Sequence, residues 1–153
     1  MELIMQPTST TCGQACIAMI TEKSIEEVIQ TMKTDGPTSI GQLIEVLDVY
    51  KINHAERNTR ISKKNPVPYK YSILTVHTNA GYTHWTLLFD GKYYDPEFGL
   101  IEGEYTHGKI TSFLAIYEQW YTVEEAIRMN EVVKEYLEKY PREVIEMHNA
   151  LSF

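Results

Sequence analysis

A cysteine at the start of a helical segment is the first residue of this chain whose type and position could do chemistry. Cys12 stands in Thr10-Thr11-Cys12-Gly13, where apolar residues begin to recur at helical spacing. The unpaired N–H groups and positive dipole end of such a helix favour a thiolate over a thiol. Gly13 would leave room for a substrate backbone to approach. Taken alone, Cys12 is more typical of a small buried apolar side chain.

A base for that thiol could come from His84, which interrupts the apolar run Thr83–Phe89. The Asp90-Gly91 dipeptide then predicts a tight hairpin. If Phe89 pairs with the residue after Gly91, position 84 lies near position 97 and Asp95 is a short diagonal away. Its carboxylate could orient the imidazole and support an imidazolium. Separately, His84 could be a hydrogen-bonded core residue and Asp95 a turn residue before Pro96. Their conjunction with a helix-start cysteine favours a catalytic triad.

Three further residues could complete such a site. Gln6, six residues before Cys12, could donate its amide to an oxyanion beside the Cys12 backbone N–H. Without the rest of the pattern it would be an ordinary exposed polar residue. Tyr82 and Trp85 flank His84 and are therefore candidates for lining a substrate cleft.

The elements that must position these residues follow a simple order along the chain. Helices are expected from Cys12, from the capping box of Ser24 with Glu27 to about Met32, and from the capping box of Ser39 with Gln42. Strands are expected over 71–77, 83–89, 92–94 and 111–117. A capping box of Thr122 with Glu125, and the break at Pro141, predict further helices over 118–153. Helices, an antiparallel sheet and more helices indicate an α+β chain in one domain over 1–153.

Composition narrows the class of protein. The chain has 153 residues, 43% of them hydrophobic and 23% charged, which suits a globular domain. Its net charge of -7 argues weakly against binding nucleic acid. No apolar run approaches the roughly 18 residues of a membrane span, and the N-terminus lacks the basic region of a signal peptide. A cytoplasmic location is therefore expected, and the two cysteines, Cys12 and Cys16, are expected to be thiols.

The residues quoted above resemble the C39 family of papain-like cysteine peptidases. The resemblance rests on Gln6-x5-Cys12-Gly13-x-Ala15-Cys16-x-Ala18-Met19, followed by His84-Trp85 and Asp95-Pro96, and covers roughly residues 4 to 117. It implies a papain-like catalytic core over 1–117, with 118–153 as a helical extension. It also implies that Cys12 is the nucleophile, that His84 and Asp95 complete the triad, and that Gln6 supplies the oxyanion hole. The implied substrate is a peptide or protein, and no cofactor is implied.

Other interpretations remain open at this point. Cys12-x3-Cys16 with His77 and His84 is a loose match to a zinc site. Papain-like folds also carry transglutaminases, deamidases and acyltransferases, because thiolate attack on an acyl carbon is common to all of them. A binding module that keeps the fold without the chemistry is a further alternative. The sequence does not determine the scissile bond, the acceptor or the oligomeric state.

Overall fold

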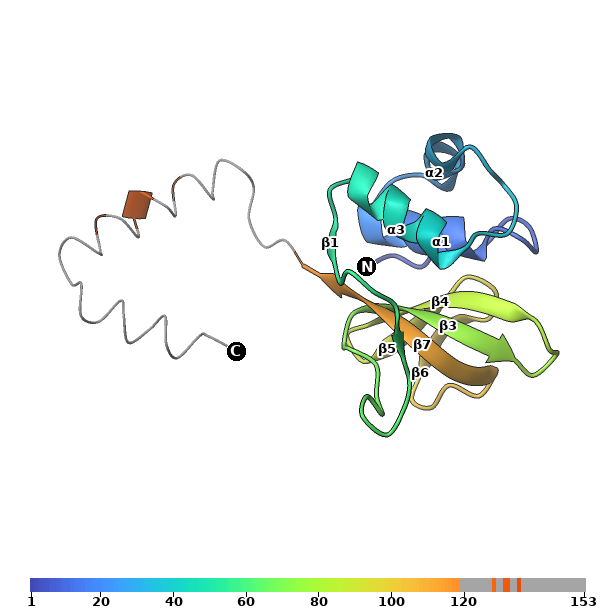
Figure 1. The fold of residues 1–153 in the computed structure, drawn as a ribbon. Helices are drawn as coiled ribbons and strands as arrows, with labels where there is room; N and C mark the ends of the chain where they lie inside the picture. Colours follow the sequence, from blue (N-terminus) through green and yellow to red (C-terminus); the bar gives the residue numbers. More distant parts are fainter. Residues whose placement is uncertain (119–127, 129–130, 133–134, 136–153) are drawn as a thin grey trace. The chain divides into compact units, whose positions relative to one another are not determined.

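The computed structural model describes residues 1–118, 128, 131–132 and 135 (Figure 1). The chain divides into two compact units, Met1–Glu118 and Gln119–Phe153. The helices predicted for 118–153 lie almost entirely outside the described residues, and the single domain stays a prediction. All of the helices and strands given below belong to the first unit.

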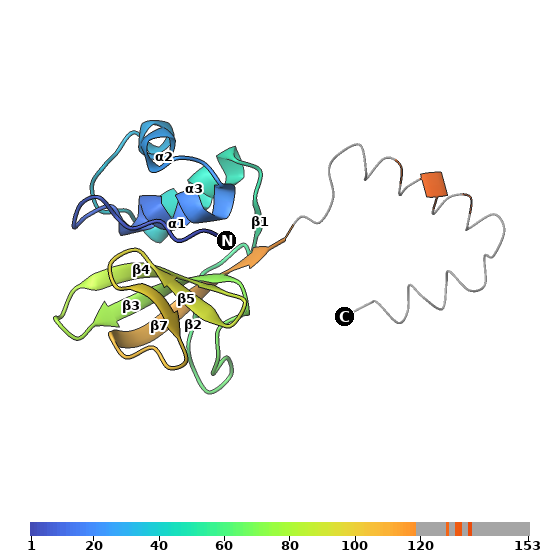
Figure 2. The ribbon, with the colours of Figure 1, turned by 180° about the vertical axis from the view of Figure 1, so that it is seen from behind.

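Three helices cover one face of an antiparallel sheet in this unit, which confirms the α+β class. They are α1 (Cys12–Thr21), α2 (Ile25–Met32) and α3 (Ile40–Val49). They lie in one layer on the same side of the strands in both views (Figures 1 and 2). Seven consecutive residues of α1, from Gly13 to Met19, are buried. The prediction of a buried helix beginning at Cys12 is therefore confirmed.

The three helices begin in different ways. Ser39 and Gln42 form the predicted reciprocal capping box before α3. Ser24 Oγ accepts a hydrogen bond from the Glu27 N–H before α2, whereas the Glu27 carboxylate accepts one from the Tyr50 hydroxyl. No side chain caps α1. The Thr11 hydroxyl, which could have capped it, instead hydrogen bonds within the preceding turn to Thr8.

The strands form one sheet in the order β1-β7-β3-β4-β5-β6, with β2 also paired to β7. Their bounds are β1 (Asn53–His54), β2 (Thr59–Arg60), β3 (Ser72–Thr78), β4 (Thr83–Phe89), β5 (Lys92–Asp95), β6 (Gly99–Glu102) and β7 (Gly108–Tyr117). The four predicted strands correspond to β3, β4, β5 and β7, and the sequence analysis missed β1, β2 and β6.

The hairpin between β4 and β5 sets the positions of the residues that matter for the site. Asp90 and Gly91 both have positive φ, 51° and 73°, as a type I′ turn requires. Phe89 pairs with Lys92, the register expected from the sequence, and pairing continues to Leu87 opposite Tyr94. The first residues of β4 therefore extend beyond the end of β5. His84 lies in that stretch.

Two apolar clusters hold the unit together, one on each face of the sheet. The larger contains buried side chains of α1, α2 and α3 together with Trp85 and Leu87 of β4. The smaller, on the other face, includes Leu74, Val76 and Tyr105. Because successive strand residues point to opposite faces, Trp85 faces the helices and His84 faces the side on which Tyr105 lies.

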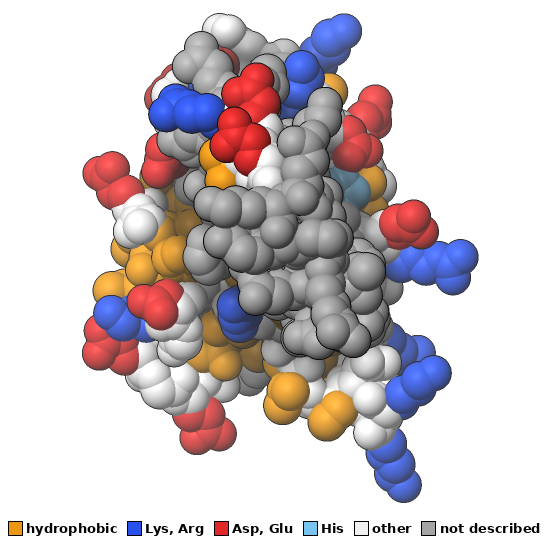
Figure 3. All heavy atoms as spheres, turned by 90° about the vertical axis from the view of Figure 1, so that its left-hand side faces the viewer, with side chains coloured by type: hydrophobic (Ala, Val, Ile, Leu, Met, Phe, Trp, Pro, Cys, Tyr) orange, Lys and Arg blue, Asp and Glu red, His pale blue; other side chains and the backbone are white. Residues whose placement is uncertain are grey.

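The described surface is mixed in charge. Acidic and basic side chains are interspersed among apolar areas on the face shown in Figure 3. None of the described helices has the length and apolar character needed to cross a bilayer.

Candidate active site

A buried ion pair between His84 and Asp95 lies at the centre of the candidate site. His84 Nε2 is 2.8 Å from Asp95 Oδ1. The His84 side chain is 2% exposed and that of Asp95 is fully buried. The hairpin brings them together, since His84 is near the start of β4 and Asp95 is the last residue of β5. A buried charge of this kind persists only if it is paired and hydrogen bonded.

Asp95 meets that condition through a full set of donors. Oδ1 accepts from His84 Nε2 and from the backbone N–H groups of Glu97 and Phe98, at 2.9 and 3.0 Å. Oδ2 accepts from the Tyr105 hydroxyl at 2.7 Å. Burial alone would raise the pKa of Asp95, but the hydrogen bond and positive charge of His84, followed by these other donors, lower it below its ordinary value. Asp95 is therefore a carboxylate fixed in position.

Cys12 is the first residue of α1, and this helix packs against β4, the strand that carries His84. Asp95 occupies Nε2 of the imidazole, which leaves Nδ1 for another partner. Burial lowers the pKa of His84, but hydrogen bonds to Asp95 and Cys12, together with their negative charges, raise it to about 9. The imidazole is thus protonated at neutral pH in the presence of both partners. A cysteine beside an imidazolium held by a carboxylate can act as a nucleophile.

The uncapped start of α1 gives Cys12 a second favourable feature. The first turn of α1 contains no acidic residue, and no side chain accepts from its N–H groups. Orphan amides at a helix start attract negative charge. In α2 and α3 a serine takes that place. The backbone N–H of Cys12 belongs to this first turn, and its role as an oxyanion donor stays a prediction.

Gln6 is joined to the same site through its backbone. Its N–H donates to the Pro96 carbonyl at 2.8 Å, which attaches the loop before α1 to the residue directly after Asp95. Its side-chain Oε1 is buried without a hydrogen-bond partner among the described residues. This oxygen is an acceptor and would pair with a donor group, whereas an oxyanion would need the side-chain NH2 group of Gln6. An oxyanion role for Gln6 stays a prediction.

Gly13 and Trp85, two residues expected to contact substrate, instead pack against other parts of the protein. A Cβ added to Gly13 would lie 2.1 Å from Thr38 Oγ1 and 3.2 Å from Trp85 Cδ1. Trp85 is buried and donates from Nε1 to the Thr38 carbonyl at 3.0 Å. The space beside Gly13 therefore admits Thr38 of the loop before α3, not a substrate backbone. The glycine is needed because helix and loop approach so closely.

Tyr82 lies at the exposed edge of the group around His84, and its role in lining a cleft stays a prediction. It is 43% exposed, and its hydroxyl donates to Glu97 Oε1. That hydrogen bond, followed by burial and the charge of Glu97, raises the pKa of Tyr82 to about 12. Glu97 Oε2 in turn lies 3.7 Å from His84 Nδ1.

The sequence analysis missed Glu97, Phe98 and Tyr105 as members of the site. A signal for Glu97 was present, because the hairpin register already placed position 97 opposite His84. Phe98 is 37% exposed, and its ring meets that of His84 edge to face, with centroids 5.8 Å apart. Tyr105 comes from the segment between β6 and β7, for which the sequence offers no local signal.

The zinc alternative does not fit the positions of its four ligands. Cys16 is fully buried in the larger apolar cluster, whereas His77 is exposed on β3. Burial, followed by the charges of Cys12 and Asp95, raises the pKa of Cys16 well above its ordinary value, so it stays a thiol. Among the described residues, no three His, Cys, Asp or Glu side chains form a group able to hold a metal ion.

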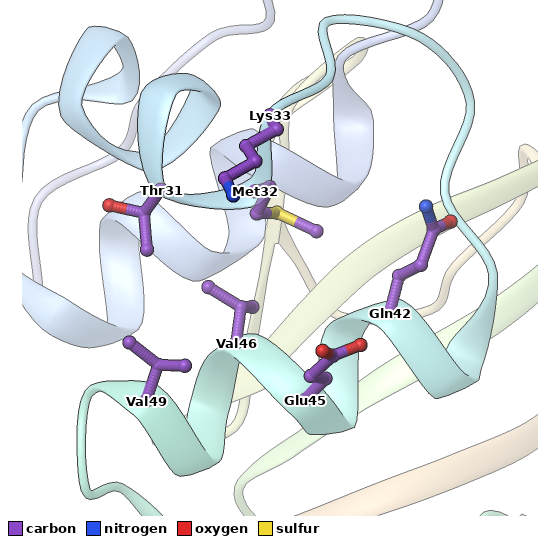
Figure 4. A pocket seen from close by; sticks show the side chains of 7 residues that line it. All are labelled: Thr31, Met32, Lys33, Gln42, Glu45, Val46 and Val49. Carbon is purple, nitrogen blue, oxygen red and sulfur yellow. The ribbon is translucent and has the colours of Figure 1, made fainter.

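A separate hollow of about 220 Å³ lies between α2 and α3 (Figure 4). It is lined by Thr31, Met32, Lys33, Gln42, Glu45, Val46 and Val49. None of these residues belongs to the group around His84. The hollow therefore offers no nucleophile or base for the chemistry considered above.

The structure thus groups His84 and Asp95 with Tyr105, Glu97 and Phe98, and it places Cys12 at the start of the helix that packs against β4. No protein-family model matches the chain, and no curated protein matches it either.

Proposed function

We propose that this chain is a C39-like cysteine peptidase with a papain-like fold, which hydrolyses a peptide or isopeptide bond through Cys12, His84 and Asp95. One observation carries the proposal. A fully buried carboxylate with four donors holds the imidazole of His84, and Cys12 stands at the uncapped start of a helix that packs against the same strand. Structural histidines rarely need so complete a set of partners on one side and a thiol on the other.

The reaction follows from these positions. Cys12 Sγ, its proton held on His84 Nδ1, attacks the acyl carbon and forms a tetrahedral intermediate. The C–N bond then breaks, and Nδ1 gives the proton to the departing amine. Water attacks the resulting thioester and gives a proton to Nδ1, and cleavage of the C–S bond restores Cys12 and releases the acid. Asp95 keeps Nε2–H oriented and supports the imidazolium throughout.

The oxyanion of each tetrahedral intermediate would form beside the first turn of α1. We assign its stabilisation to the Cys12 backbone N–H and to the Gln6 amide. The bond between Gln6 N–H and the Pro96 carbonyl supports this assignment, because it holds Gln6 close to the triad. Preorganised donors at the site of developing charge are worth several kcal/mol, on the order of 3. A reduced thiol suits a reducing compartment such as the cytoplasm.

The proposal can be tested without knowing the natural substrate. The purified full-length chain is incubated with a mixed library of peptides, and new N-termini are identified by mass spectrometry. We expect cleavage by the wild-type chain and by Cys16→Ala, and none by Cys12→Ala or His84→Ala. Cys16→Ala is the matched control, since it removes the other thiol from the same helix.

Two outcomes would contradict the proposal. Cleavage that persists in Cys12→Ala would exclude this cysteine as the nucleophile. A labelled primary amine in the same mixture measures transfer directly, and incorporation of that amine without new N-termini would identify an acyltransferase instead of a peptidase.

A further inference from the structure

The turn after Asp95 forms a rigid, acidic and aromatic rim beside the candidate catalytic histidine. Asp95 Oδ1 accepts the N–H groups of both Glu97 and Phe98, so the carboxylate that orients His84 also fixes this turn. The Phe98 ring stacks on His107 with centroids 4.0 Å apart and planes at 4°. Tyr82 fixes Glu97 by a hydrogen bond from its hydroxyl. The rim is thus preorganised before any ligand arrives.

Among the described residues, the only basic neighbour of the negative charge on this rim is His84. Glu97 is 31% exposed, and among the described residues its carboxylate forms no ion pair with a lysine or arginine. Its nearest cationic group is His84 Nδ1 at 3.7 Å, beyond the usual range for a hydrogen bond. The Glu97 carboxylate therefore faces the site without serving as the partner that orients His84, a role that Asp95 fills.

We propose that Glu97, Tyr82 and Phe98 form a subsite that selects a basic residue, lysine or arginine, next to the bond that is cleaved. The ammonium or guanidinium group would meet Glu97, and the aliphatic stem would lie along the rings of Phe98 and Tyr82. Long basic side chains combine these two requirements, a cationic tip and an apolar stem. A cation beside aromatic faces gains a further attraction. This inference rests on the proposed function, because it identifies the substrate class of the same site.

The first test uses alkylating reagents that react at Cys12 without any peptide. N-(4-aminobutyl)iodoacetamide and the neutral N-pentyl iodoacetamide have tails of similar length, and their rates at Cys12 are compared by mass spectrometry. We expect the wild-type chain to react about two to five times faster with the cationic reagent, as for a partly exposed ion pair. Glu97→Gln should abolish this ratio, since glutamine can still accept the Tyr82 hydroxyl but carries no charge.

Glu102→Gln is the matched control, because Glu102 is an exposed glutamate of β6 whose ion-pair partner is Lys92. It should keep the wild-type ratio. A ratio that survives in Glu97→Gln, or that is lost equally in Glu102→Gln, would overturn the proposal, since the preference would then come from the net charge of the protein.

A second arm separates this inference from the proposed peptidase activity. In Cys12→Ala, which cannot react, the NMR signals of Tyr82 and Glu97 are followed while acetyl-arginine amide is added. We expect larger shifts than with acetyl-norleucine amide. If Cys12 is unreactive in the wild-type chain but these shifts occur, the subsite is supported and the proposed peptidase activity is refuted. Equal shifts with both amides would refute the subsite itself.

Discussion

Tyr105→Phe removes one hydroxyl from the buried group around Asp95 and tests how that carboxylate is held. Within the described part of the chain, three of the four donors to Asp95 reach Oδ1, and only the Tyr105 hydroxyl reaches Oδ2. The substitution would therefore leave one oxygen of a fully buried carboxylate without a donor. A hydrogen bond to a charged group contributes about 1.5–3 kcal/mol. Because Asp95 is fully buried, we expect the free energy of unfolding to fall by an amount in the upper half of that range.

The measurement is urea unfolding followed by tryptophan fluorescence, with Tyr93→Phe as the matched control. Tyr93 packs against Tyr105 with ring centroids 5.2 Å apart, and its hydroxyl forms no hydrogen bond among the described residues. Its substitution should change the free energy of unfolding by less than about 0.5 kcal/mol. If Tyr105→Phe costs no more than the control, the hydroxyl does not support a buried charge and our account of Asp95 fails.

The dependence of this loss on pH gives an independent check. The pKa of Asp95 is lowered in the folded chain from its ordinary value of 3.8. Its ionised form therefore stabilises the fold above that pH, and this contribution is lost as pH falls through the folded pKa. The difference between wild type and Tyr105→Phe should be full at neutral pH and should narrow below about pH 4. A difference that grows on acidification would contradict the assignment of charge.

Four other predictions concern the thiols, His84, Asp95 and Gly13. A limiting amount of iodoacetamide at mildly acidic pH should label Cys12, which is half-buried, before Cys16, which is fully buried and whose pKa is raised. Peptide mapping measures the labelling, and equal labelling of the two thiols would exclude a selectively reactive Cys12. Activity should fall as pH rises through about 9, because His84 then loses its proton. The protonated imidazole also stabilises the fold; this contribution to the free energy of unfolding is complete below pH 6.5 and should be lost as pH rises through about 9. Asp95→Asn should reduce kcat/KM by roughly 10- to 100-fold and should shift the alkaline limb of its pH profile to lower pH. If that limb does not shift, Asp95 does not set the pKa of His84. Gly13→Ala should lower the free energy of unfolding by about 1–3 kcal/mol, because the added Cβ clashes with Thr38. Gly41→Ala is the control and should be neutral or stabilising, because the nearest atom there is Ser39 Oγ at 3.8 Å. If thermal melts show no loss of stability in Gly13→Ala, Thr38 moves freely.

Features with a local cause could be predicted from the sequence. The capping residues Ser24 and Ser39 mark the starts of α2 and α3, and the Asp90-Gly91 turn determines the pairing of β4 with β5. That register also placed Asp95 close to His84. In each case, residues within one turn or one hairpin determine the outcome, so no knowledge of the tertiary fold is needed.

Features that depend on distant segments could not be predicted. The strands β1 and β2 have two residues each, too few for a period, and they exist because the long strand β7 offers them pairing partners. The contact of Gly13 with Thr38 depends on the path of the loop before α3, and Tyr105 reaches Asp95 only after the chain has passed through β6. A sequence pattern shows which residues could act, whereas the packing decides what surrounds them.

The separation of the proposed triad along the chain has a consequence for the order in which its residues meet during folding. His84 and Asp95 are only 11 residues apart, on two strands of a single hairpin, and such local pairs close rapidly. Cys12 and Gln6 come from the opposite end of this unit, and they reach the hairpin only when the helical layer docks onto the sheet. Contacts of long sequence separation form late because loop closure is costly. If the proposed triad is correct, Cys12 meets His84 in one of the last folding steps, and an incompletely folded chain lacks the complete triad.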